Sequence, residues 1–189
     1  MDNKQKFISL TKQIQRPGIE RLMGWLENNT DFFTAPASTR FHGAEPGCLC
    51  AHSLAVAKWM CILAHPIALV TGKKFSKESL LIVSLFHDLC KCNCYKAGTR
   101  NVKDETTGRW EKVPCYTWEE QQCFGGHGAK SMYLVQFFMK LNFEEAAAIN
   151  SHMGFSDANI NSVSSCYDQN TLAWLLHIAD EAATYIDKM

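Results

Sequence analysis

Apolar residues recur at helical spacing along most of the chain. After Pro17, which suits the first turn of a helix, the residues Ile19, Leu22, Met23 and Leu26 fall on one face. The same spacing predicts further helices at about 48–64, 77–91, 128–140, 143–153 and 170–187. Pro66 favours an end to the first of these helices, and Ser76 fits the N-cap of the next.

Residues 97–121 break this helical pattern. Two polar arms that contain valine and tryptophan flank Thr107-Gly108, a pair typical of a tight turn. The chain contains no internal repeat, low-complexity tract or interdomain linker. We therefore predict one all-α domain, residues 1–189, with helices in 1–30 and a small β-hairpin-like insertion around residues 97–121.

Composition fits an ordinary globular domain that does not act on long nucleic acid. Hydrophobic residues make up 47 % of 189, enough to bury a core. Lys+Arg and Asp+Glu number 19 each, so no overall basic field points to long nucleic acid, whereas a small anionic ligand needs only a local basic patch. The nine cysteines are an odd number, and neither a signal peptide nor an apolar run near the ~18 residues of a membrane span is evident. We expect a reduced, cytoplasmic setting without a membrane.

Ionisable side chains interrupt the apolar faces of three predicted helices. These are His52, His87 and Asp180, and Asp88 directly follows His87. A buried carboxylate needs a cation, an arginine or hydrogen-bond donors, and few arginines lie nearby in the sequence. Any one of these residues alone is readily explained by a hydrogen bond to the backbone. Four of them together favour a metal, because ligands from several helices can converge in a bundle.

The order of these residues resembles the H…HD…D signature of the HD-domain superfamily of metal-dependent phosphohydrolases. The segments "GCLCAHSLAVA", "LFHDLCK" and "LLHIADEAA" are similar to the family's first-histidine helix, its HD-x-x-K motif and its last-aspartate helix. The resemblance covers about Phe41 to Tyr185. It implies an HD-domain helical bundle whose metal-site core spans residues 41–185.

Two further histidines extend the resemblance to the branch of the superfamily that has two metals. His127 lies at a predicted helix start and His152 at a predicted helix end. The implied ligands are His52, His87, Asp88, His127, His152 and Asp180, with Asp88 shared by both ions. The implied cofactor is one or two divalent transition metals (Mn, Fe, Ni, Co or Zn), with Mg as a further candidate. Without the resemblance, His127 is interpreted as a solvated helix cap. His152 is then interpreted as a histidine at the negative end of a helix dipole.

The resemblance also implies a reaction, the hydrolysis of a phosphate mono- or diester by metal-activated water. Asp88 and Lys91 are then the catalytic residues, and Lys91 faces the substrate phosphate. Lys130, in "FGGHGAKS", is a second substrate-binding candidate near a helix N-terminus. For both lysines, a solvated surface position is the alternative. The expected partner is a small phosphorylated molecule such as a nucleotide or short oligonucleotide.

Other interpretations remain open from the sequence. The same ligands would serve a di-iron oxygenase acting on a small organic substrate, or a ligand-sensing HD domain without catalysis. Cys90, Cys92 and Cys94 lack the spacing of a zinc ribbon and are interpreted as packing residues. His177 is interpreted as a residue that supports a ligand, and His42 as one that lines the site without binding metal.

Overall fold

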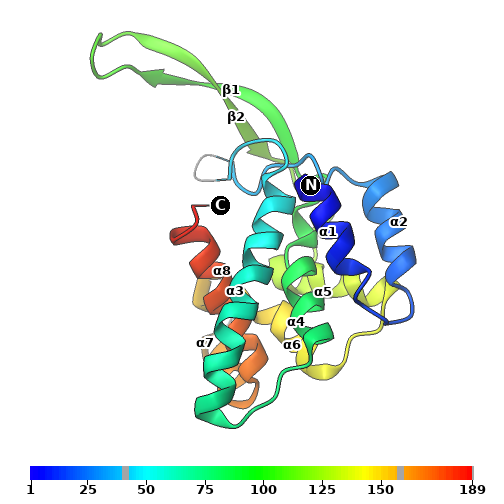
Figure 1. The fold of residues 1–189 in the computed structure, drawn as a ribbon. Helices are drawn as coiled ribbons and strands as arrows, with labels where there is room; N and C mark the ends of the chain where they lie inside the picture. Colours follow the sequence, from blue (N-terminus) through cyan, green and yellow to red (C-terminus); the bar gives the residue numbers. More distant parts are fainter. Residues whose placement is uncertain (40–42, 157–159, 189) are drawn as a thin grey trace.

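The structure is a computed structural model that describes residues 1–39, 43–156 and 160–188. The described residues form a helix-rich body with one antiparallel hairpin (Figure 1). The helices are α1 (Asn3–Thr11), α2 (Ile19–Asn29), α3 (Cys48–Thr71), α4 (Lys77–Phe86), α5 (His127–Phe138), α6 (Phe143–Ser151), α7 (Ile160–Gln169) and α8 (Thr171–Tyr185). The strands are β1 (Tyr95–Lys103) and β2 (Trp110–Trp118). The predicted helix-rich fold with a small hairpin insertion is confirmed for the described residues.

Helix α4 forms the centre of the body. All its residues from Ser79 to Phe86 are buried, and it packs against α3, α6 and α8. Phe86 also meets Phe7 of α1 edge to face, with ring centroids 5.9 Å apart, and Phe7 meets Phe32 at 5.0 Å. Burying each such ring contributes about 2–3 kcal/mol, so the N-terminal helix is held on the core that supports α4.

Helices α4 and α6 begin with similar local structure. The Ser76 side chain accepts a hydrogen bond from the Ser79 N–H, as expected for an N-cap. Asn142 and Glu145 form a reciprocal capping box at the start of α6. The Glu145 carboxylate also accepts a hydrogen bond from the Ser79 hydroxyl at 2.8 Å, which ties the first turns of the two helices together.

Helix α3 is longer than predicted, because it continues through Pro66 to Thr71 and ends at Gly72, whose φ is +71°. Proline removes one N–H donor, and Ile62, whose carbonyl loses that donor, is half exposed, so water can take the donor's place. The added length corrects the expectation about apolar runs. Among the described residues, α3 alone is long and apolar enough to cross a membrane. One such helix is weak evidence for a span, since helices in the core of soluble proteins pass the same test.

The hairpin is a long two-stranded arm that projects from the helical body (Figure 1). Its turn is closed by the Asp104 carboxylate, which accepts hydrogen bonds from the N–H groups of Thr106 and Thr107 at 2.7 and 3.2 Å. Gly108 completes the turn with φ +68°. The turn therefore lies where Thr107-Gly108 predicts it.

Candidate metal centre

Four helices bring the interior histidines and aspartates to one place. His52 comes from the first half of α3, and Asp180 comes from α8. His87 is the C-cap of α4 and His152 is the C-cap of α6, while Asp88 follows His87. All of these side chains are buried except Asp180, whose side chain is 16 % exposed.

The donor atoms form two overlapping groups. His52, His87 and Asp180 make one group, and His87, Asp88 and His152 make the other, with the donor atoms of each group within 4.8 Å of one another. His52 Nε2 lies 3.0 Å from Asp180 Oδ1 and 3.3 Å from His87 Nε2. Asp88 Oδ2 lies 3.5 Å from His87 Nε2, and Asp88 Oδ1 lies 3.4 Å from His152 Nε2. Five of the six predicted ligands are therefore brought together.

Backbone carbonyls fix the tautomers of two of these histidines. His87 Nδ1 lies 2.9 Å from the Ser84 carbonyl, and His152 Nδ1 lies 2.7 Å from the Ile149 carbonyl. A carbonyl can only accept a hydrogen bond, so each Nδ1 carries a proton and each neutral ring presents the lone pair of Nε2. Metal-binding histidines in proteins are typically oriented in this way.

The inward-facing atoms lack hydrogen-bond donors that would satisfy them. Among the described residues, Asp88 Oδ1 and His152 Nε2 are both buried without a hydrogen-bond partner. Asp88 Oδ1 and His152 Nε2 face each other, although both are acceptors when the imidazole is neutral. Such an arrangement is costly unless a cation lies between the acceptors. Imidazole nitrogen with carboxylate oxygen is a donor set that suits Zn, Mn, Fe or Ni, so these residues fit a transition metal.

The buried ionisable groups of the cluster shift one another's pKa values. Burial acts to raise the pKa of Asp88, but neighbouring groups, the charge of Lys91 foremost, outweigh burial, so this pKa lies well below its usual value. For Asp180, burial is similarly outweighed by the hydrogen bond with His52, and the pKa is lowered. Burial acts to lower the pKa values of Lys91 and His87, yet the charge of Asp88 raises both. The carboxylates thus stay ionised in a buried site.

A cavity of about 610 Å³ opens over this cluster. Lys91 lies in its wall, and its Nζ is 2.8 Å from Asp88 Oδ2. The remaining wall contains residues with hydroxyl or charged groups that the sequence did not single out, namely Ser38, Ser156, Glu181, Thr184, Tyr185 and Lys188. Glu181, Thr184 and Tyr185 follow Asp180 by one, four and five residues on α8, and that proximity was the signal available for them, whereas Lys188 lies beyond the end of the helix. The volume suits a small molecule.

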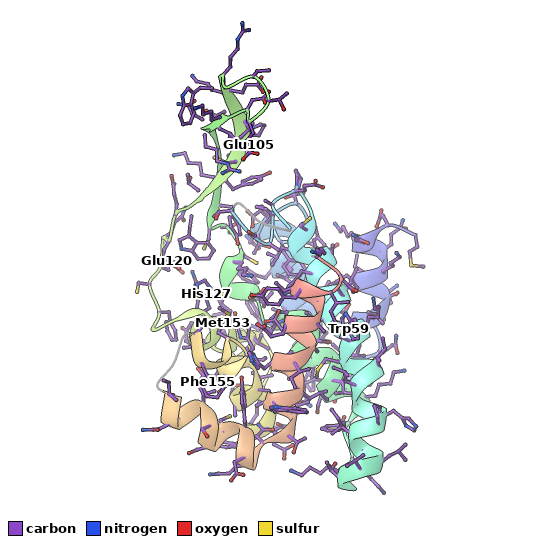
Figure 2. All side chains as sticks on the ribbon, turned by 90° about the vertical axis from the view of Figure 1, so that its left-hand side faces the viewer. Trp59, Glu105, Glu120, His127, Met153 and Phe155 are labelled. Atoms are coloured by element: carbon purple, nitrogen blue, oxygen red, sulfur yellow. The ribbon has the colours of Figure 1, made fainter. Side chains whose placement is uncertain are left out.

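Two predicted site residues lie elsewhere. His127 belongs to neither donor group; its Nδ1 lies 3.3 Å from Cys90 Sγ, and its ring centroid lies 5.2 Å from that of Trp118. Lys130 lines a separate cavity and pairs with Glu120. Side chains in Figure 2 place His127 beside the base of the hairpin. The structure therefore does not bring either residue into the cluster.

His177 lies outside the two donor groups and contacts the backbone of His152. Its Nδ1 donates to the carbonyl of His152 at 2.8 Å, and its ring stacks on Tyr167 with centroids 5.5 Å apart. The Tyr167 hydroxyl in turn donates to the Ser151 carbonyl at 2.9 Å. A Cβ added at Gly154, which has φ +61°, would lie 2.4 Å from the His177 ring. His177 thus holds the His152 segment, while His42 lies outside the described residues.

The three cysteines near Asp88 are buried. Cys90 and Cys94 are 1–2 % exposed and Cys92 is 8 % exposed. Burial raises the pKa of the Cys90 thiol to about 12, so it is protonated at neutral pH. None of the three belongs to either donor group.

Comparisons with known proteins leave the family of the chain open. No family model, no curated protein and no solved structure matches it.

Proposed function

We propose that this chain is an HD-type phosphohydrolase that cleaves a phosphate mono- or diester of a small molecule by attack of water. One observation carries the proposal. Buried acceptors converge at the base of an open cavity, and two of the imidazoles have their Nε2 lone pairs oriented inward by backbone carbonyls. The order of these residues along the chain matches the H…HD…D resemblance. The helix-rich body fits the same proposal, which includes a one-domain organisation and a cytoplasmic location.

The proposed ligands are His52, His87, Asp88, His152 and Asp180. A divalent transition metal held by them would lower the pKa of a coordinated water and offset the negative charge of a phosphoryl oxygen. The protein's own residues supply the arrangement for that chemistry. Ser84 and Ile149 fix the two imidazoles, and the pKa of Asp88 keeps its carboxylate ionised.

Lys91 is proposed to bind the substrate phosphate. It is a cation in the cavity wall, and its pKa is raised because burial is outweighed by the charge of Asp88. From this position the Lys91 ammonium group would donate a hydrogen bond to a phosphoryl oxygen of a substrate in the cavity. The cavity volume of about 610 Å³ favours a nucleotide or a strand end over a large surface.

The test is turnover of two simple esters, p-nitrophenyl phosphate and bis(p-nitrophenyl) phosphate. Metal-depleted protein is reloaded with Mn, Fe, Ni, Co or Zn, and rates are measured in air and under argon. Asp88→Asn should abolish both metal binding and turnover. Lys91→Met should keep the metal and lower turnover by about a hundredfold, because one preorganised cation is removed. Asp168→Asn, on exposed α7, is the matched control and should behave as wild type.

Isotope labelling identifies the nucleophile. In ¹⁸O-water, attack of water on phosphorus places one labelled oxygen in the phosphate product. Turnover that requires O₂, or a fully active Asp88→Asn protein, would overturn the proposal. A protein that binds metal yet hydrolyses neither ester under any of these conditions would favour the alternative of a ligand sensor without catalysis.

A further inference from the structure

The pairing register sorts the side chains of the hairpin onto two faces. Residues directly opposite in an antiparallel pair point to the same side of the sheet, and successive residues alternate. One face, here called the aromatic face, consists of Tyr95, Ala97, Thr99, Asn101 and Lys103 of β1 and Trp110, Lys112, Pro114, Tyr116 and Trp118 of β2. Four of its ten side chains are aromatic and two are lysines, and none is acidic.

The outer end of the aromatic face combines an exposed aromatic ring with cations. Trp110 is 69 % exposed, Lys103 lies directly across from it, and Lys112 lies two residues further along the same face. Both lysines are exposed. Between Tyr95 and Trp118 the hairpin contains five basic and three acidic residues, although the chain as a whole has no net charge. The local excess of positive charge favours an anionic partner.

The inner end of the aromatic face meets the rim of the cavity. Tyr95 packs against Tyr116 and Trp118, with ring centroids 6.3 and 5.2 Å apart. The Tyr95 hydroxyl donates to the carbonyl of Ala37 at 2.8 Å, and Ala37 lines the cavity that contains Asp88. In Figure 2 the hairpin rises from this region, with Glu105 towards its far end. A strand of nine residues spans about 30 Å, so the face forms an extended track leading to the cavity.

An exposed aromatic ring beside two cations, at the outer end of an extended surface, is suited to one class of partner. Unpaired bases stack on aromatic side chains, and lysines contact the phosphates that connect the bases. A duplex hides its base faces and offers only its backbone. An acidic protein would match the lysines but would leave the exposed Trp110 without a stacking partner.

We propose that the aromatic face binds single-stranded nucleic acid and directs the end of the strand to the cavity. Binding of a strand depends only on the observations made on the hairpin. Delivery of a terminal phosphate ester to Asp88 and Lys91 rests on the proposed function. A short strand on a local basic patch is compatible with the neutral overall charge.

Fluorescence anisotropy of the full chain tests this proposal. The probes are fluorescein-labelled oligothymidylate and oligouridylate 12-mers, with EDTA present so that no turnover occurs. Wild type should bind both. Trp110→Ala should bind at least about fivefold more weakly, the lower limit for one stacked base, and Trp110→Tyr should retain most of the affinity. Lys112→Ala should lower the slope of log affinity against log salt concentration by about 0.7.

The chain offers matched controls remote from the hairpin. Phe143, at the start of α6, is an 88 % exposed aromatic residue, and Lys74 is an exposed lysine between α3 and α4. Phe143→Ala and Lys74→Ala should bind like wild type. Trp110→Ala should also hydrolyse p-nitrophenyl phosphate at the wild-type rate, which separates the hairpin from the metal centre.

Three results would overturn the inference. They are the absence of binding by wild type, equal binding by wild type and the two hairpin alanine variants, and equal affinity for a 12-base-pair duplex. If wild type bound no strand but self-associated through Trp110, the aromatic face would be an interface between copies of the chain. In each case, continued hydrolysis of p-nitrophenyl phosphate would leave the proposed function standing.

Discussion

Replacing Arg16 with methionine should destabilise the domain by about 3–5 kcal/mol, because it leaves a buried carboxylate unpaired. The Arg16 guanidinium donates from Nη1 and Nη2 to the two Glu145 oxygens at 2.8 and 3.0 Å. The Glu145 side chain is 0 % exposed, and its other hydrogen bonds, from Ser79 and the Asn142 N–H, carry no charge. The loss therefore exceeds that of a surface ion pair.

This cost is measurable as a change in melting temperature. For a domain of this size about 1 kcal/mol shifts the midpoint by roughly 2–4 °C, so metal-free Arg16→Met should melt roughly 6–20 °C below wild type. Thermal unfolding followed by circular dichroism at pH 7 provides the measurement. Arg16→Met/Glu145→Gln should recover most of the loss, since glutamine removes the buried charge and keeps an oxygen that can accept a hydrogen bond. Lys4→Met, which breaks an exposed pair with Glu27, is the control and should change stability by less than about 1 kcal/mol.

The same ion pair predicts a pH dependence. Burial acts to raise the pKa of Glu145, but the hydrogen bond from Arg16 outweighs burial, so the folded-state pKa lies below its usual value. The stabilisation is therefore present above the unfolded pKa of about 4.3 and is lost as the pH falls through the folded pKa. The gap in melting temperature between wild type and Arg16→Met should shrink as the pH falls below about 4.3 towards the lower folded-state pKa. A loss of unfolding free energy below about 1 kcal/mol at pH 7 would refute this reasoning. So would a difference in melting temperature that does not change with pH.

Three further outcomes are expected. His177→Ala should weaken metal binding by about tenfold, measured by competition with a chromophoric chelator, because the His152 segment loses its hydrogen bond; unchanged affinity would exclude this supporting role. His127→Ala should keep wild-type metal content, and loss of metal on elemental analysis would place His127 among the ligands after all. Iodoacetamide should label exposed Cys61 and Cys123 well before Cys90, by mass spectrometry of digests, and equal rates would contradict the burial of Cys90.

Local sequence signals accounted for most of the helices and for the hairpin. Ser76 and Asn142 form N-caps with their own first turns, so these helix starts depend on neighbours within three residues. Thr107-Gly108 similarly encodes its own turn. The course of α3 past Pro66 was not predictable, because proline inside a helix removes a hydrogen bond and clashes with the preceding turn, and local sequence does not show that the helix tolerates this cost. Helix α7 was missed because it is mostly polar, with Val163 as its one buried residue.

The candidate site was predictable where each ligand occupied an apolar face or a helix end. His52, His87 and Asp180 interrupt buried stripes, and that conflict with the core is visible in the sequence. His127 met the same order-based expectation, yet the fold sets it against Cys90 and Trp118. Its neighbours come from different segments, and no spacing along the chain encodes such contacts.

The most direct test of the central claim is the metal content of the purified chain. Tag-free protein, prepared without added metal or chelator, is analysed by elemental mass spectrometry alongside the double variant His87→Gln/Asp88→Asn. We predict at least one equivalent of a divalent transition metal per wild-type chain and close to none in the variant, which removes a ligand from both donor groups. Wild-type protein that holds no metal, even after reconstitution with Mn, Fe, Ni, Co or Zn, would contradict the account and leave the cluster as a polar core.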